Sequence, residues 1–498
     1  MNFLKFLIAT SFISLLGVSC SSNEPKSKIG EKWELKGAQD RIEKYRMGER
    51  TLVFVDGDKS LSNESVQFEL SKLDFMIGTS LTQSSGFDEP GEPGYKYHDN
   101  YWKYLKNICN MVTVGYYWSG ILYNGPTDYH LDETSLNWAR ENGLKIKGHP
   151  MAWHNSVPPW AIKTTDPDQM MDFMKEHIKN ILEMSPDIKL WDVYNEAVGS
   201  FGKEVTESGV QRWLRSYCGP KCSYHNDTIS TEGVKDGEYP YENCVDLAMK
   251  DLYAYVNSVI GDDIVITHNH YSHKAPLNPF TNRPRFLEQC EYFEREGVEY
   301  DVIGIQTHMH EEFSVISEDE MIQLLEDYSK FGKPIHFTEV TVPSFEIFKS
   351  GEETLKHELA AEKARAAFKK DSTVVVPYRA SVAEYEEYQA QYIHDFLTTA
   401  FSYPNVEMFV VWNFTDINAW RSTASGILDL KNEPKPAYRA IEKLVKEDWH
   451  TEVDDETNIK GKLTFKGFYG DYKGVINGQE FEFTLSKDSP KEIIIKLK

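Results

Sequence analysis

Eight nearly continuous apolar segments of strand length alternate with helical patterns between residues 74 and 414, and this alternation restricts the fold more than any other feature of the chain. Strands that read as unbroken apolar runs are typical of parallel sheets that are covered on both faces. Eight consecutive β/α units close into a barrel, so the sequence predicts an α/β fold, a (β/α)8 TIM barrel with small flanking β-strand elements. The predicted strands are 74–80, 111–115, 144–153, 188–196, 263–271, 301–308, 334–340 and 408–414.

Helices are predicted most clearly between these strands over residues 135–143, 168–184 and 242–260. Successive strands begin roughly 35 to 45 residues apart, except after the fourth and the seventh, where the interval is about 75 residues, near twice the usual unit of such a barrel. The connections that follow the strands of a TIM barrel build its active-site face. We therefore expect the two extra segments, 199–242 and 343–385, to lie over the mouth of the barrel.

Alternating polar and apolar residues predict short strands at both ends of the chain. We expect an N-terminal β-strand element over 33–72, the barrel over 73–447 and a small C-terminal β module over 458–498. Asn477-Gly478 lies between two alternating runs and predicts a hairpin turn. The two ends either join in one β module that packs on the barrel, or the C-terminal module stands alone.

The first 20 residues resemble a bacterial export signal. Lys5 precedes an apolar run over 6–18 that is too short to span a membrane comfortably, and small residues lead to Cys20. This pattern resembles a lipoprotein signal, in which cleavage leaves Cys20 as a lipid-bearing N-terminus; a plain secretory signal is the alternative. We expect 1–20 to be the signal, 21–32 to be a polar tether, and the protein to be lipid-anchored at the outer membrane, at the cell surface or in the periplasm.

Charge and composition narrow the range of partners. Lys and Arg number 54 against 78 Asp and Glu, and a formal net charge of −24 argues against nucleic acid or another anionic polymer as a partner. A neutral substrate is the simpler expectation. Aromatic residues make up 13% of the chain, and their flat faces suit sugar rings as well as protein cores.

Five cysteines remain besides Cys20. Cys218, Cys222 and Cys244 lie close in sequence, but three soft ligands are too few for a zinc site. One disulfide among them is plausible in an exported protein, and the pairing stays open. Cys109 and Cys290 fall in helical stretches and are expected to be buried as small hydrophobes.

Two glutamates stand at the ends of the fourth and seventh predicted strands, where side chains point into the mouth of a barrel. A single strand-terminal glutamate is more often a cap or an ion-pair partner, but here each is beside an amide or an imidazole. Retaining cleavage of a glycoside needs two carboxyl groups about 5–5.5 Å apart, one as proton donor and one as nucleophile. The donor has to stay protonated, which burial and a neighbouring charge can enforce. We predict Glu196 as the acid/base and Glu339 as the nucleophile.

Six stretches of sequence carry a family resemblance: GHPMAWH, WDVYNEA, GIQTHMH, HFTEV, VVWNFTD with NAWR, and KPAY. Their order and spacing resemble glycoside hydrolase family 10, the endo-β-1,4-xylanase family, over roughly 70–444. The resemblance implies a retaining hydrolase that cleaves internal β-xylosidic linkages of xylan-type polysaccharide. It implies no cofactor and no metal. We expect a monomer that binds polysaccharide, does not bind nucleic acid and meets a membrane only through its N-terminal anchor.

The same resemblance implies that the remaining matches bind substrate. Asn195 resembles the residue that holds the sugar 2-hydroxyl, and His308 the one that positions the nucleophile, with Gln306 on the same strand. The other matches are expected to contour the sugar pocket or to form its aromatic walls, although core packing is the alternative for the tryptophans and a structural role for the histidines. They are His149, Trp153, His154, Trp412 and Trp420.

Two stretches depart from the family pattern. The family's ENEMKW cluster grips the sugar beyond the cleaved one on the non-reducing side; after the second strand it is replaced here by Gly115-Tyr116-Tyr117-Trp118 within VTVGYYWSG (112–120). The family's NDYN stretch reads NHYS (269–272). Aromatic stacking discriminates sugar stereochemistry less sharply than hydrogen bonds do. We therefore expect an endo-acting β-xylanase, or a close relative that cuts a decorated or unusual β-xyloside polymer. The alternatives are a hydrolase of another β-linked glycan and a catalytically inactive glycan-binding surface lipoprotein.

Overall fold

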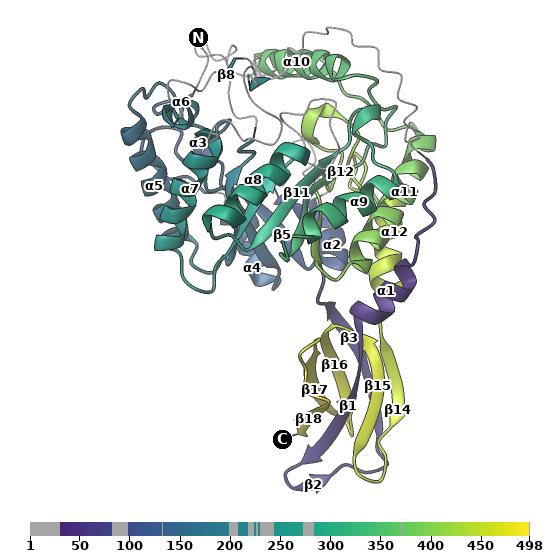
Figure 1. The fold of residues 1–498 in the computed structure, drawn as a ribbon. Helices are drawn as coiled ribbons and strands as arrows, with labels where there is room; N and C mark the ends of the chain where they lie inside the picture. Colours follow the sequence, from purple (N-terminus) through teal and green to yellow (C-terminus); the bar gives the residue numbers. More distant parts are fainter. Residues whose placement is uncertain are drawn as a thin grey trace.

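All eight predicted strands are present and form one closed parallel barrel, which confirms the predicted TIM-barrel fold (Figure 1). The computed structural model describes residues 30–81, 98–131, 133–198, 208–217, 224–225, 228–229, 244–271, 283–368, 370–371 and 373–497. The barrel strands are β4 (Met76–Ser80), β5 (Met111–Gly115), β6 (Lys145–His149), β7 (Leu190–Asn195), β10 (Val265–His270), β11 (Val302–His308), β12 (Ile335–Thr341) and β13 (Val406–Val411). They run in this order around the barrel, with β10 beside β7 and β13 beside β4.

Helices surround the barrel, and the three predicted from sequence are present as α4, α5 and α7. The α-helices are α1 (Ala38–Tyr45), α2 (His98–Ile108), α3 (Trp118–Ile121), α4 (Glu133–Glu141), α5 (Pro167–Met184), α6 (Gly209–Ser216), α7 (Cys244–Val259), α8 (Arg283–Glu296), α9 (Glu318–Ser329), α10 (Gly351–Phe368), α11 (Ala383–Ser402) and α12 (Pro436–Lys443). Shorter turns of helix are η4 (Glu312–Ser314), η5 (Trp420–Ser422) and η6 (Leu444–Asp448).

Helix α5 illustrates why these segments fold as they do. The Asp166 side chain accepts hydrogen bonds from the first backbone N–H groups of the helix, and Pro167 occupies the first helical position, where its missing N–H costs nothing. Met170, Met174 and Ile178 recur every four residues and are buried. This single apolar stripe faces the barrel and leaves the charged side chains in solvent.

Strands from both ends of the chain pair in two further sheets. The strands are β1 (Met47–Asp56), β2 (Lys59–Ser60), β3 (Ser65–Leu73), β14 (Glu452–Glu456), β15 (Lys462–Phe468), β16 (Gly470–Ile476), β17 (Gln479–Leu485) and β18 (Glu492–Leu497). One sheet has the order β15-β1-β18 with β2 on β1, and the other β14-β3-β16-β17. The predicted Asn477-Gly478 turn joins β16 to β17, and both residues have the positive φ that such a turn requires.

This β module lies at the amino-terminal end of the barrel strands, away from the mouth (Figure 1). The Arg46 guanidinium donates to the carbonyl oxygens of Phe401, Tyr403 and Val406, which precede or begin β13. Trp449 stacks on Phe401 with ring centroids 4.0 Å apart. The two ends of the chain therefore brace the base of the barrel, and the opposite end is left to the functional site.

The second long segment lies over the mouth, as predicted, because its helix α10 contacts η5 beyond the end of β13. Most of the first long segment lies outside the described residues; the described parts are α6 and the short strands β8 (Tyr224–His225) and β9 (Thr228–Ile229). Cys109 and Cys290 are free and buried, as predicted. Cys244 is disulfide-bonded, whereas Cys218 and Cys222 lie outside the described residues.

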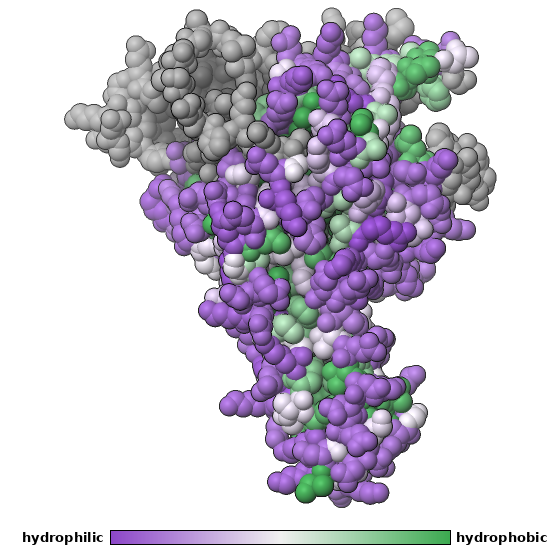
Figure 2. Space-filling model, turned by 90° about the vertical axis from the view of Figure 1, so that its right-hand side faces the viewer, coloured by the Kyte–Doolittle hydropathy of each residue, from purple (hydrophilic) through white to green (hydrophobic). Residues whose placement is uncertain are grey.

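One side of the molecule is covered largely by hydrophilic residues, with small apolar areas on the barrel and on the β module (Figure 2). No helix in the described part of the chain is long and apolar enough to cross a membrane. The expected signal and Cys20 lie outside the described residues.

Candidate active site

Glu196 follows β7 directly and stands at the mouth of the barrel. Its φ of 59° is in the left-handed region, which residues with side chains rarely adopt. Its N–H donates to the carbonyl oxygen of Asn269 at 3.1 Å, and the indole N–H of Trp153 donates to its carboxylate at 3.3 Å. Uncommon backbone conformations held in place by surrounding bonds are frequent at functional sites.

Three buried amide side chains connect Glu196 to Glu339. The Gln306 amide donates to Glu196 Oε1 at 3.1 Å and to Asn195 Oδ1 at 3.0 Å. The Asn269 amide donates to the same Asn195 oxygen at 2.9 Å and to Glu339 Oε1 at 3.0 Å. Because Asn195 Oδ1 accepts both bonds, the orientation of that amide is determined, and the described residues offer no partner to its nitrogen.

Glu339 is only 4% exposed and receives a second donor from the neighbouring strand. The His308 ring lies with Nε2 3.1 Å from Glu339 Oε2 and Nδ1 2.8 Å from the Thr341 hydroxyl. Burial lowers the pKa of His308, which favours the neutral imidazole. An ionised carboxylate can only accept, so Nε2 carries the proton and Nδ1 accepts from Thr341. The Glu339 carboxylate thereby sets the tautomer, and the Thr341 hydroxyl satisfies the other ring nitrogen.

A buried ion pair lies beneath the carboxylates. Asp192 Oδ2 is 2.6 Å from both Lys147 Nζ and His149 Nδ1, and all three side chains are almost fully buried. Burial alone would raise the pKa of Asp192, but the charge of Lys147 and the bond from His149 lower it below its ordinary value. His149 Nε2 in turn lies 3.9 Å from Glu339 Oε1. The pair therefore orients His149 toward Glu339.

The two glutamates have opposite proton affinities. Burial, followed by the charge of Glu339, raises the pKa of Glu196 to about 7. Burial also acts to raise the pKa of Glu339, but the charge of His149 and the bond from His308 hold it below the ordinary value of 4.5. Near neutral pH one carboxyl group can thus donate a proton while the other is an ionised nucleophile or base.

Two tryptophans stand beside this network. Trp412, at the end of β13, is 7% exposed and packs edge-on to His149 and His308, with ring centroids 5.6 and 6.1 Å away. Trp420 in η5 is 39% exposed, and its centroid is 4.5 Å from that of His308. Trp420 therefore presents far more aromatic surface to solvent than Trp412 does.

Residues 77–217 and 258–444, more than half of the chain, match the profile of the family described as glycosyl hydrolase family 10. The chain belongs to glycosyl hydrolase family 10. This confirms the family that the sequence motifs predicted.

Relatives of this family 10 protein share modest identity with it. Anti-sigma-I factor RsgI6 of Acetivibrio thermocellus is 23% identical over 451 residues, 88% of this chain and 46% of that protein, so the chain spans less than half of it. Endo-1,4-beta-xylanase B of Thermotoga neapolitana is 23% identical over 328 residues, 63% of this chain and 73% of that protein. The structure of xylanase 10B from Thermotoga petrophila RKU-1 in complex with xylobiose is similar with a TM-score of 0.52 at 20% identity, over 75% of this chain and 95% of that one, and supports the fold.

The family 10 barrel brings most of the sequence-predicted site residues together, with two exceptions. His154 is 6% exposed, and its ring stacks on Tyr194 with centroids 6.3 Å apart rather than contacting either glutamate. Burial lowers the pKa of His154 to about 3. His154 therefore packs behind the hydrogen-bonded network of the two glutamates and is not part of that network. Cys20 lies outside the described residues.

Sequence reasoning missed the ion pair of Lys147 and Asp192. Its signal was a basic residue at an alternate position of an apolar strand, KIKGH, where only a buried counter-charge could satisfy it.

The three aromatic residues after β5 have different environments, which the sequence did not show. Tyr116 and Trp118 are buried in the core, whereas the Tyr117 ring lies at the mouth, 5.6 Å from that of His149.

Helix α10 is tied to the segment that carries Trp420. Arg421 lies over the Trp420 ring at 4.4 Å and pairs with Glu311 at 3.1 Å and with Glu358 of α10 at 2.7 Å. Three residues of the 418–422 segment, Arg421 among them, have positive φ. The bend that exposes Trp420 is thus held by ion pairs to two other elements.

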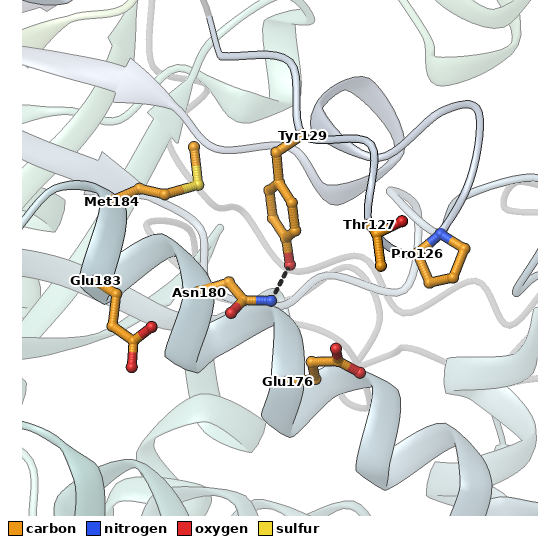
Figure 3. A pocket seen from close by; sticks show the side chains of 7 residues that line it. All are labelled: Pro126, Thr127, Tyr129, Glu176, Asn180, Glu183 and Met184. Atoms are coloured by element: carbon orange, nitrogen blue, oxygen red, sulfur yellow. Dashed lines mark hydrogen bonds between the residues drawn. The ribbon is translucent and has the colours of Figure 1, made fainter.

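A shallow pocket of about 310 Å³ lies elsewhere, between the loop before α4 and helix α5 (Figure 3). It is lined by Pro126, Thr127, Tyr129, Glu176, Asn180, Glu183 and Met184. None of the predicted site residues lines it. In the described residues no group of three or more His, Cys, Asp or Glu side chains could hold a metal ion.

Proposed function

We propose that this protein is a retaining glycoside hydrolase that cleaves internal β-xylosidic linkages of xylan-type polysaccharide, with Glu196 as acid/base and Glu339 as nucleophile. The observation that carries the proposal is that Glu196 and Glu339 meet at one barrel mouth, joined by buried amide side chains, in surroundings that shift their pKa values in opposite directions. Two carboxylates with divided proton affinity are the working parts of glycoside hydrolysis. The Thermotoga xylanases and the xylobiose complex support the choice of substrate.

In the proposed first step the Glu339 carboxylate attacks the anomeric carbon while Glu196 donates its proton to the glycosidic oxygen. The carbon–oxygen bond to the leaving sugar breaks, and a glycosyl ester forms on Glu339. In the second step ionised Glu196 takes a proton from water, the water oxygen attacks the anomeric carbon, and Glu339 leaves. Two displacements return the original β configuration and restore both side chains.

The surrounding residues fit this chemistry. The Asn195 amide nitrogen is available to donate to a sugar hydroxyl, since its oxygen is already engaged by Gln306 and Asn269. We assign that bond to the 2-hydroxyl beside the reacting carbon. Trp412 and Trp420 are assigned as the walls of the sugar site, Trp420 being the one with an accessible face.

Turnover on a panel of xylans, mixed-linkage glucan and mannan tests the proposal, with the product anomer recorded by NMR in the first minutes. We expect short β-configured xylo-oligosaccharides. Initial α product would contradict retention. Products from glucan or mannan alone would indicate another β-glycan as substrate, and binding without turnover would indicate a glycan-binding protein.

The pH profile of kcat/KM is expected to be bell-shaped. Glu196 acts as an acid only while protonated, so activity should fall about tenfold per pH unit above roughly pH 7. Glu339 acts only while ionised, so the acid limb should lie below pH 4.5. Initial rates on a soluble aryl β-xyloside between pH 3 and pH 9 check this. An alkaline limb that starts near pH 5 would place the acid in another environment.

We further propose export and lipid attachment at Cys20, which rest on the sequence pattern of residues 1–20. Labelling with a radioactive fatty acid in a bacterial host should mark the wild-type protein and not Cys20→Ser. Equal labelling of both would contradict attachment at that residue.

A further inference from the structure

Tyr117 is the one member of the aromatic stretch after β5 whose ring contacts residues of the candidate site. Its centroid lies 5.6 Å from that of His149, with the rings nearly perpendicular, and 5.8 Å from that of Trp153. Its neighbours are anchored in the core. The Tyr116 hydroxyl bonds to Ser185 at 2.5 Å, and Trp118 is 2% exposed.

These two anchors determine where Tyr117 points. Tyr116 packs edge-on to Trp191, and Trp118 stacks on His177 with centroids 5.3 Å apart. The backbone then begins α3, and the carbonyl oxygen of Tyr117 accepts from the helix it precedes. With its neighbours held in the core, the Tyr117 side chain is kept at the mouth, where it is partly exposed.

The charges of both glutamates act on the Tyr117 phenol. Burial raises the pKa of Tyr117 well above its ordinary value, and the charges of Glu339, Glu196 and Asp192 raise it further. The phenol therefore keeps its proton at every working pH. No hydrogen-bond partner for this hydroxyl is found in the described part of the chain. A neutral donor on a ring that packs against His149 and Trp153 at the mouth is thus left for a ligand.

We propose that Tyr117 is a specificity-determining residue whose phenol O–H donates a hydrogen bond to one ring hydroxyl of the sugar held at Glu339. This inference rests on the proposed function and names one polar contact that the sugar would make. A phenol bears no charge and offers one donor in a fixed plane. It therefore recognises a single hydroxyl and tolerates substituents elsewhere on the sugar.

The simpler alternative is that the Tyr117 ring only packs against His149 and Trp153. Tyr117→Phe separates the two ideas, because it keeps the ring and removes the hydroxyl. A contact to substrate predicts a loss of about three- to tenfold in kcat/KM, the usual value of one neutral hydrogen bond. Packing alone predicts no loss in Tyr117→Phe and a loss in Tyr117→Ala.

A series of aryl β-xylosides that each lack one ring hydroxyl identifies the contact. Removing a hydroxyl changes the intrinsic reactivity of the sugar, but the ratio of wild type to Tyr117→Phe cancels that change. We expect the ratio of kcat/KM between wild type and Tyr117→Phe to be the same for the full sugar and for every analogue except one. For the analogue that lacks the contacted hydroxyl, the ratio should fall to about one. A ratio near one for every substrate, or one that never changes within the series, would overturn the proposal.

Tyr116→Phe is the matched control, since its hydroxyl bonds to Ser185 in the core. Tyr116→Phe should lower the melting temperature. It should give the same ratio of kcat/KM to wild type for every analogue in the series. Xylobiose affinity, measured by calorimetry on wild type and Tyr117→Phe, separates this inference from the proposed function. If the wild type showed no turnover, the proposed function would be wrong. Even then, a weaker xylobiose affinity in Tyr117→Phe than in the wild type would support the hydroxyl contact, and an equal affinity would contradict that contact.

Discussion

Glu339→Gln is expected to lower kcat on an aryl β-xyloside by roughly 10⁵-fold or more, because the covalent step loses its nucleophile. Glutamine has nearly the same shape: its oxygen can accept from Asn269, and its amide can donate to His308 Nε2 once the His308 proton moves to Nδ1 and is donated to the Thr341 hydroxyl. The fold should therefore persist, with a melting temperature close to that of the wild type. Steady-state kinetics with a sensitive chromogenic leaving group, alongside thermal unfolding, measure both.

Glu407→Gln is a suitable control, since Glu407 lies on the adjacent strand β13 near its amino-terminal end and is half exposed. It should retain wild-type kcat. Azide sharpens the test in the smaller variant Glu339→Ala, in which the anion can take the place of the carboxylate and attack the anomeric carbon directly. One displacement gives the α-glycosyl azide. Wild-type turnover in Glu339→Gln, or β-azide from Glu339→Ala, would remove Glu339 from the role of nucleophile.

Glu196→Ala is expected to reduce polysaccharide cleavage by about 10²–10⁴-fold and to spare substrates with good leaving groups. A sugar leaving group needs a proton as the bond breaks, whereas a dinitrophenolate leaves without one. For the dinitrophenyl β-xyloside the first step should stay fast, and the second should become limiting because no base activates water. A burst of dinitrophenol followed by slow turnover is the expected signature.

Azide again distinguishes the roles. In Glu196→Ala it should accelerate the second step and yield the β-glycosyl azide, because it attacks the ester on Glu339 from the opposite face. Equal losses on polysaccharide and on the activated substrate would show that Glu196 is not the acid. The same measurement on Gln306→Ala, which removes a donor to Glu196 without removing a carboxyl group, should give a smaller loss on both substrates.

The barrel could be predicted because its signal is local and repeated. Each strand reads as apolar on its own, and eight such runs with helices between them leave few other ways to bury both faces. The placement of Glu196 and Glu339 followed from the same pattern, since both end such strands. Their hydrogen-bonded connection through Asn195 did not, because it needs the register between β7, β10 and β11.

Other features depend on contacts between distant segments. Tyr116, Tyr117 and Trp118 are alike in sequence, yet only the packing of Trp191 and His177 decides that the first and third are core residues. Likewise, the pairing of β1 with β15 and β18 joins residues more than 400 positions apart. The alternation of polar and apolar residues within a strand does not predict which other strand pairs with it.

The sequence by itself determined the barrel, its strand order and the two glutamates at the mouth, because these depend on periodicity and on position within a strand. Only the tertiary structure decided how the glutamates differ. Glu196 is buried beside a carboxylate, and Glu339 beside His149 and His308, so their pKa values move in opposite directions. Such shifts depend on burial and on charges from other strands, which come together only when the barrel closes.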